Sequence, residues 1–235
     1  MRVSIGEHFS WEGEVLRKLV NRCSSLLVLS VLIALSQNSS ATTIDVGSGG
    51  AADCTFWCVD RYQQVYASSI FSGPVLIDAV SFFAAPDNGG PTWNGTSTWQ
   101  MTLSTSVNLV GSLDPTFNNN VGGDAALFDT RTFTGTQNVN DLITFDGAGS
   151  FVYDPGNGDL LIDIIRTAGT AQGVGLDRGT DPTLMDRAYA FSSTIAADGW
   201  NQGFGNRTRF AVVPEPSSAL LLGLGLAGIA ARRRQ

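Results

Sequence analysis

Residues 98–104 read Thr-Trp-Gln-Met-Thr-Leu-Ser, and this short stretch is the clearest indication of how the chain folds. Large apolar side chains alternate in it with an amide and with hydroxyl groups. Successive side chains of a β-strand point to opposite faces of a sheet, so Trp99, Met101 and Leu103 would share one face. The stretch therefore predicts a strand with one face in a hydrophobic core.

A second strand is predicted over residues 159–167, where Leu160, Ile162 and Ile164 line one face. The opposite face is also mostly apolar, which suits a strand that is largely buried on both sides. Other runs are rich in β-branched and aromatic residues, and clusters of Gly, Asn, Asp and Pro separate them. These runs are residues 75–85, 125–133, 142–145, 151–153, 187–193 and 208–213.

Short strands with turn signals between them are typical of an antiparallel sandwich or jelly roll. The body shows no sustained helical periodicity, and at most a turn or two of helix is expected, around residues 60–67. We therefore expect an all-β fold, a single antiparallel β-sandwich or jelly-roll-like domain over residues 42–212. A signal helix within residues 1–41 would precede it, and a short apolar helix within residues 213–235 would follow.

The amino-terminal segment has the pattern of a secretory signal peptide. Residues 26–35 are apolar and follow Arg17, Lys18 and Arg22, while the small residues Ser39 and Ala41 stand at the −3 and −1 positions of a plausible cleavage site. A charged region, a short apolar region and a small-residue exit are the parts of such a signal. We expect the body to be exported as an ectodomain.

The body is strongly acidic once both ends are set aside. Residues 42–213 contain seventeen aspartates and seven arginines, a net charge of −10, and contain no Lys, Glu or His. Such a surface makes nucleic acid an improbable partner. Without His, neither a Ser-His-Asp triad nor an imidazole zinc site can form, and we expect no metal and no cofactor.

Aspartate pairs are the one acid–base chemistry that this composition leaves open, as in a glycosidase. Most of the aspartates, however, stand beside Gly, Asn or Pro, as in residues 87–90 and 154–158. Aspartate in such contexts stabilises turns by bonding the nearby backbone. Residues 118–124 (Asn-Asn-Asn-Val-Gly-Gly-Asp) carry enough oxygen atoms for calcium, but they match no calcium loop pattern, and turn chemistry is favoured.

Cys54 and Cys58 are the two cysteines of the body, in the order Cys-Thr-Phe-Trp-Cys. An exported protein meets an oxidising compartment, so a local structural disulfide between them is favoured over free thiols or redox chemistry. Tryptophans offer flat faces for stacking on sugar rings. Trp57, Trp99 and Trp200 are expected mainly in packing roles, and Trp93, among Gly, Pro and Asn, is the best candidate for an exposed glycan contact.

The last 23 residues have three parts in a fixed order. Pro214, Glu215 and Pro216 come first, an uncharged apolar run over residues 217–231 follows, and Arg232, Arg233 and Arg234 come last, before Gln235. Positive flanks stay on the cytoplasmic side of a membrane. The apolar run has 15 residues, about 22 Å of helix at about 1.5 Å per residue against a hydrocarbon core of about 30 Å.

This tail resembles the PEP-CTERM sorting signal of exported bacterial proteins. The resemblance implies that an exosortase recognises and processes the tail, and that the inner membrane holds the protein transiently through the short helix. It also implies a destination in the cell envelope or outside the cell, often alongside exopolysaccharide. We expect the ectodomain to be a non-catalytic structural or glycan-binding module, with an aspartate-dependent hydrolase as the alternative.

Overall fold

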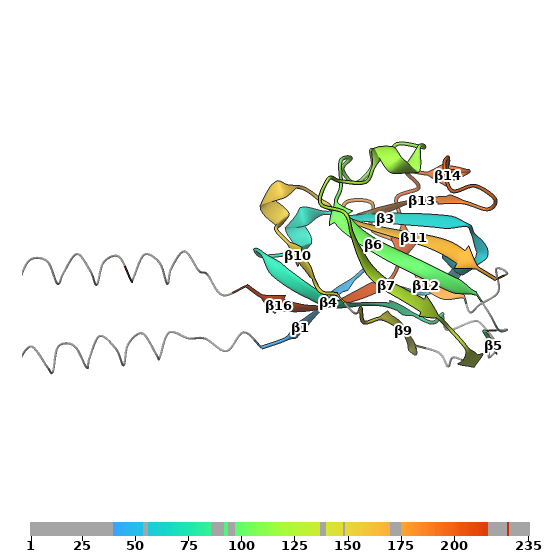
Figure 1. Cartoon of the computed structure of the whole chain (residues 1–235), viewed down its shortest axis with the longest axis horizontal. Helices are drawn as coiled ribbons and strands as arrows, with labels where there is room; N and C mark the ends of the chain where they lie inside the picture. The colour runs from blue at the N-terminus through green and yellow to red at the C-terminus, as the bar shows by residue number, and fades with distance from the viewer. Residues whose placement is uncertain are drawn as a thin grey trace, which may run out of the picture. The chain divides into compact units, whose positions relative to one another are not determined.

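The computed structural model describes residues 40–53, 56–85, 92–93, 97–136, 140–147, 149–169 and 175–215, together with Gly225. Residues 40–215 form one compact unit. The strands of this unit pair antiparallel throughout (Figure 1). The prediction of an antiparallel all-β body is confirmed, whereas the signal helix expected within residues 1–41 lies outside the described residues.

The larger of two main sheets has six strands in the order β14-β13-β3-β11-β6-β7. Their bounds are Gly199–Trp200 (β14), Met185–Ala190 (β13), Arg61–Tyr66 (β3), Leu160–Ala168 (β11), Thr98–Thr105 (β6) and Ala126–Thr132 (β7). Strands β6 and β11 were both expected from their alternation. They pair with each other, so that Ile162 stands opposite Leu103.

The second main sheet has five strands in the order β1-β16-β4-β10, with β9 also paired to β4. Their bounds are Thr42–Val46 (β1), Thr208–Pro214 (β16), Val75–Phe83 (β4), Phe151–Tyr153 (β10) and Leu142–Phe145 (β9). The first and last strands of the unit, β1 and β16, are therefore direct neighbours.

Two small sheets and four short 3-10 helices complete the described structure. One small sheet joins β15 (Gly205–Asn206), β12 (Leu176–Gly179) and β2 (Ala52–Asp53), and the other joins β5 (Thr92–Trp93) and β8 (Gly135–Thr136). The helices are η1 (Phe56–Cys58), η2 (Ser68–Ile70), η3 (Phe117–Asn119) and η4 (Pro155–Asn157). Among the described residues, no helix is long and apolar enough to span a membrane.

The two main sheets contribute to one hydrophobic core. Trp99, Met101 and Leu103 of β6 have no exposed surface, as their alternation predicted, and they share this core with Ile77 and Phe82 of β4. Burial of apolar surface at about 25 cal/mol per Å² is the main stabilising contribution to such a fold. The aromatic rings meet mostly edge-on; Tyr66 and Phe210, for example, have centroids 4.9 Å apart.

The prediction of a helical turn around residues 60–67 was wrong, because residues 61–66 form β3 in the middle of the larger sheet. All six residues of β3 are buried. Tyr62 and Tyr66 pack in the main core. Val65, on the opposite face, packs with Leu113 and Phe117 of the long loop that joins β6 to β7, residues 106–125. Since both faces of the strand are covered, its sequence lacks the polar alternation that marks a half-exposed strand.

Candidate functional site

A buried ion pair fastens a long loop to the outer face of the six-stranded sheet. Arg61 of β3 donates from Nε to Oδ1 of Asp163 at 2.9 Å and from Nη2 to Oδ2 at 2.5 Å. Its Nη1 donates to Oδ1 of Asn118 at 2.9 Å and to the backbone oxygen of Thr194 at 2.7 Å. Every nitrogen of this guanidinium therefore has a partner, and the ring of Phe117 lies 5.0 Å from its central carbon.

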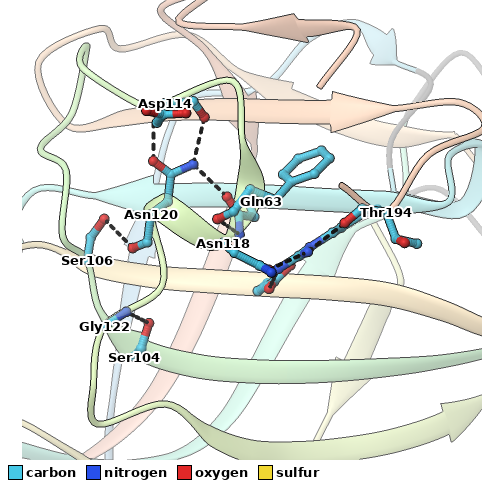
Figure 2. A network of polar contacts seen from close by, with 11 residues as sticks. Gln63, Ser104, Ser106, Asp114, Asn118, Asn120, Gly122 and Thr194 are labelled. Carbon is cyan, nitrogen blue, oxygen red and sulfur yellow. Dashed lines mark hydrogen bonds and ion pairs between the residues drawn. The ribbon is translucent and has the colours of Figure 1, made fainter. Parts of the chain in front are cut away.

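The same network continues through two buried amides (Figure 2). Nδ2 of Asn120 donates to Oε1 of Gln63 and to the backbone oxygen of Asp114, each at 2.9 Å, and Oδ1 of Asn120 accepts from the Asp114 N–H at 2.8 Å. Nε2 of Gln63 donates to the Phe117 backbone oxygen at 3.1 Å. Asn120 and Gln63 are fully buried with their hydrogen bonds made, which is the arrangement of a structural network.

The loop over residues 118–124 uses its oxygen atoms within the protein. Asn118 and Asn120 accept the bonds described above, and Asp124 accepts from the Thr105 N–H at 2.9 Å and from its hydroxyl at 2.7 Å. Across the part of the chain that the structure describes, no three His, Cys, Asp or Glu side chains gather as metal ligands would.

A second group, made of four polar side chains and one aromatic ring, lies where β12 and β15 meet β3 and β13. We call it the arginine corner, and it consists of Asp53, Arg178, Arg187, Phe204 and Asn206. Two guanidinium groups lie against one ring, because the central carbons of Arg187 and Arg178 are 4.2 Å and 4.9 Å from the Phe204 centroid. Nη1 of Arg187 also forms an ion pair with Oδ2 of Asp53 at 2.9 Å.

Hydrogen bonds from the Gln64 side chain to the backbone of Asn206 hold β15 closely against β3 in this corner. Oε1 of Gln64 accepts from the Asn206 N–H at 2.7 Å, and Nε2 of Gln64 donates to the Asn206 backbone oxygen at 2.9 Å. A side chain at Gly205 would not fit, since its Cβ would stand 2.5 Å from Cδ of Gln64. Glycine at position 205 thus permits the approach of the two strands.

The arginine corner differs from the network of Figure 2 because its hydrogen bonding is incomplete. The side-chain Oδ1 and Nδ2 of Asn206 have no partner although the residue is fully buried, and Nε of Arg178 is also buried without one. Buried polar groups in folded proteins are normally paired. Nothing in the sequence marks these residues, which are far apart in the chain and meet only through the fold.

The tryptophans fall into different environments. Trp99 is fully buried in the core, and Trp57 packs partly buried against that core. Trp200 is 43% exposed, which makes it the tryptophan with the largest described exposure. Trp93, the residue expected to contact glycan, lies in β5, but its side chain is outside what the structure describes, so its exposure stays a prediction.

Cys58 closes the short helix η1 and is disulfide-bonded. Cys54 lies outside the described residues. The pairing of Cys54 with Cys58 is therefore still a prediction.

The final strand of the unit ends inside the segment expected to be a sorting signal. Pro214 is the last residue of β16 and stands opposite Val75 of β4, and the Glu215 N–H donates to the Pro74 backbone oxygen at 3.1 Å. Proline has no N–H for a ladder, so it is suited to the end of a strand. Pro216 and the three arginines, Arg232, Arg233 and Arg234, lie outside the described residues.

A protein-family model, the PEP-CTERM protein-sorting motif, matches residues 212–234. The chain carries a PEP-CTERM sorting motif. The match covers the end of β16, the Pro-Glu-Pro triplet, the apolar run and the arginines, as the resemblance of the tail predicted. No curated protein and no solved structure matches the chain.

The PEP-CTERM motif indicates that the protein is exported and sorted to the cell envelope or the exterior, with processing by an exosortase. Because the motif begins at residue 212 and β16 ends at Pro214, the two overlap by three residues. The ectodomain therefore runs into its PEP-CTERM motif without a spacer.

Proposed function

We propose that this PEP-CTERM protein is a component of the cell envelope or extracellular matrix whose ectodomain has a structural or glycan-binding role and no catalytic one. The contacts that the aspartates make within the protein support this proposal. Apart from the exposed Asp78, every aspartate in the described ranges takes part in an ion pair, a hydrogen bond or an electrostatic contact.

Two kinds of contact account for most of these aspartates. Some neutralise arginines across strands, as Asp60 does for Arg166 and Asp45 does for Arg209. Others accept backbone N–H groups in turns, as Asp186 does from Gln202 at 2.8 Å and from Gly203 at 3.1 Å. The turn context of the aspartates predicted only local turn bonds, such as those that Asp154 accepts from the Gly156 N–H and Asp181 from the Thr183 N–H.

The pKa directions that the structure gives are opposite to those a general acid requires. The Arg209 guanidinium beside Asp45 lowers the pKa of that carboxyl group, and bonds from Thr116 and Thr183 lower the pKa values of Asp114 and Asp181. A carboxyl group that donates a proton near neutral pH needs its pKa raised by burial. These three side chains are held in the ionised form instead.

Hydrolysis assays test the non-catalytic role. The purified exported protein is incubated with polysaccharides, esters and peptides, and in parallel is passed over matrix glycan from the producing cells. We expect no turnover and weak retention on the glycan. Turnover that disappears on one aspartate-to-asparagine change, with the circular dichroism unchanged, would establish the alternative, an aspartate-dependent hydrolase.

Three finer features belong to the same proposal. The two main sheets form a β-sandwich, supported by their shared core. The apolar run holds the protein in the inner membrane until the exosortase acts, supported by the arginines that follow it. Cys54 is the partner of Cys58, supported by their closeness in the sequence.

A further inference from the structure

The last residues of β16 are held differently from the rest of the strand. Val212 has a register partner on each side, Thr42 of β1 and Ile77 of β4, and is only 1% exposed. Strand β1 begins at Thr42, so among the described residues the segment 213–215 pairs on the β4 side alone. We call residues 213–215 the latch.

Few contacts keep the latch on β4. Pro214 and Glu215 are exposed and Val213 is half-buried, so separating the latch from β4 uncovers little apolar surface. Pro214 has no N–H to donate, and the Glu215 N–H donates to the Pro74 backbone oxygen at 3.1 Å. Segments with few buried contacts open locally while the rest of a protein stays folded. We therefore expect the latch to open more readily than the rest of β16.

The pairing on either side of the latch favours an opening confined to it. The register of β16 against β4 shifts between Ala211 and Val212, directly before the latch. Such a shift interrupts the regular ladder of hydrogen bonds, so the pairs after it can separate without the pairs before it. On its other side, β4 pairs with β10 over residues 75–77. Strand β4 therefore stays in its sheet when the latch leaves it.

The sorting motif begins at the same point. It matches residues 212–234, so the latch contains Pro214 and Glu215, the first two residues of the Pro-Glu-Pro triplet. We propose that the latch controls processing, and that the exosortase acts on the chain only while residues 213–215 are separated from β4. The inference rests on the processing that the motif indicates, and it is independent of the role of the ectodomain.

The closed latch and a processing enzyme need the same backbone groups. Extended peptides are bound largely through their main-chain hydrogen bonds, and in the closed latch the Glu215 N–H already donates to the Pro74 oxygen. An enzyme that acts on a transiently opened segment works at a rate set by the fraction of molecules that are open. The processing rate should therefore fall when the latch is held closed and rise when the triplet is moved out of the sheet.

A disulfide across the latch holds it closed. Leu76→Cys with Val213→Cys places the two cysteines directly opposite each other, at half-buried positions. Opposite residues of an antiparallel pair have Cα atoms about 4.5–5.5 Å apart, which a disulfide can span. An oxidising compartment favours the bond. The matched control is Leu76→Ser with Val213→Ser, which changes the same positions and cannot form a bridge.

Pulse–chase labelling of producing cells that contain the exosortase measures the loss of the tail from the full chain. The wild type and the serine pair should be processed at similar rates, and the cysteine pair about tenfold more slowly or less, since its open fraction is removed. Thiol labelling before and after reduction shows whether the new bond has formed.

A spacer tests the opposite change. Gly-Ser-Gly-Ser inserted between Val213 and Pro214 leaves the triplet intact and moves it beyond the end of the sheet. Processing should become about fivefold faster or more, the factor that corresponds to losing one backbone hydrogen bond. The spacer combined with the cysteine pair should also be processed, because the triplet then lies outside the disulfide.

The outcomes separate the latch from sorting itself. A bridged cysteine pair that is processed as fast as the serine pair overturns the latch. A cysteine pair that stays unprocessed even with the spacer also overturns it, because the block would then not come from holding the triplet in the sheet. If the cysteine pair does not fold or does not form its bond, the spacer alone decides, and an unchanged rate overturns the latch. A wild-type chain that keeps its tail would contradict processing through the motif, and the latch with it.

Discussion

Pro214, the first residue of the Pro-Glu-Pro triplet, stands directly opposite Val75 in the five-stranded sheet. The Glu215 N–H extends this contact by one more bond, to the Pro74 backbone oxygen. The processing signal thus starts within the last strand of the ectodomain. The ends of strands open at low free-energy cost, so we expect the last residues of β16 to separate from β4 before a processing enzyme acts.

Replacing Pro214, Glu215 and Pro216 with alanine should block maturation and leave export intact. We expect export to depend on the separate amino-terminal signal predicted from the sequence, whereas the triplet belongs to the sorting motif. Substitutions at the exposed end of a strand change the free energy of unfolding by about 0.5 kcal/mol or less, so the fold should survive. Immunoblots of membrane and medium fractions measure the outcome, and normal processing of the variant would contradict it.

Arg61→Met should destabilise the ectodomain by about 3–5 kcal/mol, because it leaves the buried Asp163 carboxylate without a partner. Urea unfolding measures the change. Arg209→Met is the control; its ion pair with Asp45 is about one-third exposed on each side, and exposed pairs contribute about 0–1 kcal/mol. Equal losses in the two variants would refute the structural role given to the buried pair.

Tyrosine ionisation should be coupled to unfolding at high pH. Burial raises the pKa of Tyr62 and of Tyr66 above the ordinary tyrosine value of about 10. Their contribution to stability is complete below about pH 10, and it is lost as the pH rises from there towards the folded-state values.

Ultraviolet absorbance and circular dichroism, recorded together during an alkaline titration, measure this coupling. Tyr62 and Tyr66 should ionise only as the β spectrum disappears. Ionisation of all four tyrosines near pH 10 with the spectrum intact would show that Tyr62 and Tyr66 are not buried as described.

The exported protein should contain no free thiol. Cys58 is disulfide-bonded, and an oxidising compartment keeps such a bond formed. Thiol labelling of the denatured, unreduced protein should therefore give no signal, and labelling after reduction is the control. Two labelled cysteines in the unreduced sample would exclude the pairing of Cys54 with Cys58.

The strands that were predicted and the strand that was missed differ in how their faces are covered. Strand β6 has apolar residues on one face and polar residues on the other, so its alternation identified Trp99, Met101 and Leu103 as core. Strand β3 was missed because a loop covers its outer face and makes polar residues there, such as Gln63, part of a buried network. Periodicity reports the contrast between two faces, and β3 has little contrast.

The sorting motif could be predicted from the sequence and the arginine corner could not, because the residues of the motif are neighbours in the chain. Pro214, Glu215 and Pro216 are consecutive, so the order of residues alone revealed the motif. Arg178 and Asn206 are joined by the register of β12 and β15, which depends on the whole fold. That Arg178 forms no ion pair with a described residue is likewise a property of the folded state, since aspartates are plentiful in the sequence.

The mass and location of the protein in producing cells with and without their exosortase test the central claim most directly. With the enzyme, we expect a chain that has lost the apolar run and Arg232–Arg234 and is found in the envelope or the medium. Without it, the chain should keep its tail and stay with the inner membrane. The same mass in the same fraction from both strains would contradict sorting through the PEP-CTERM motif.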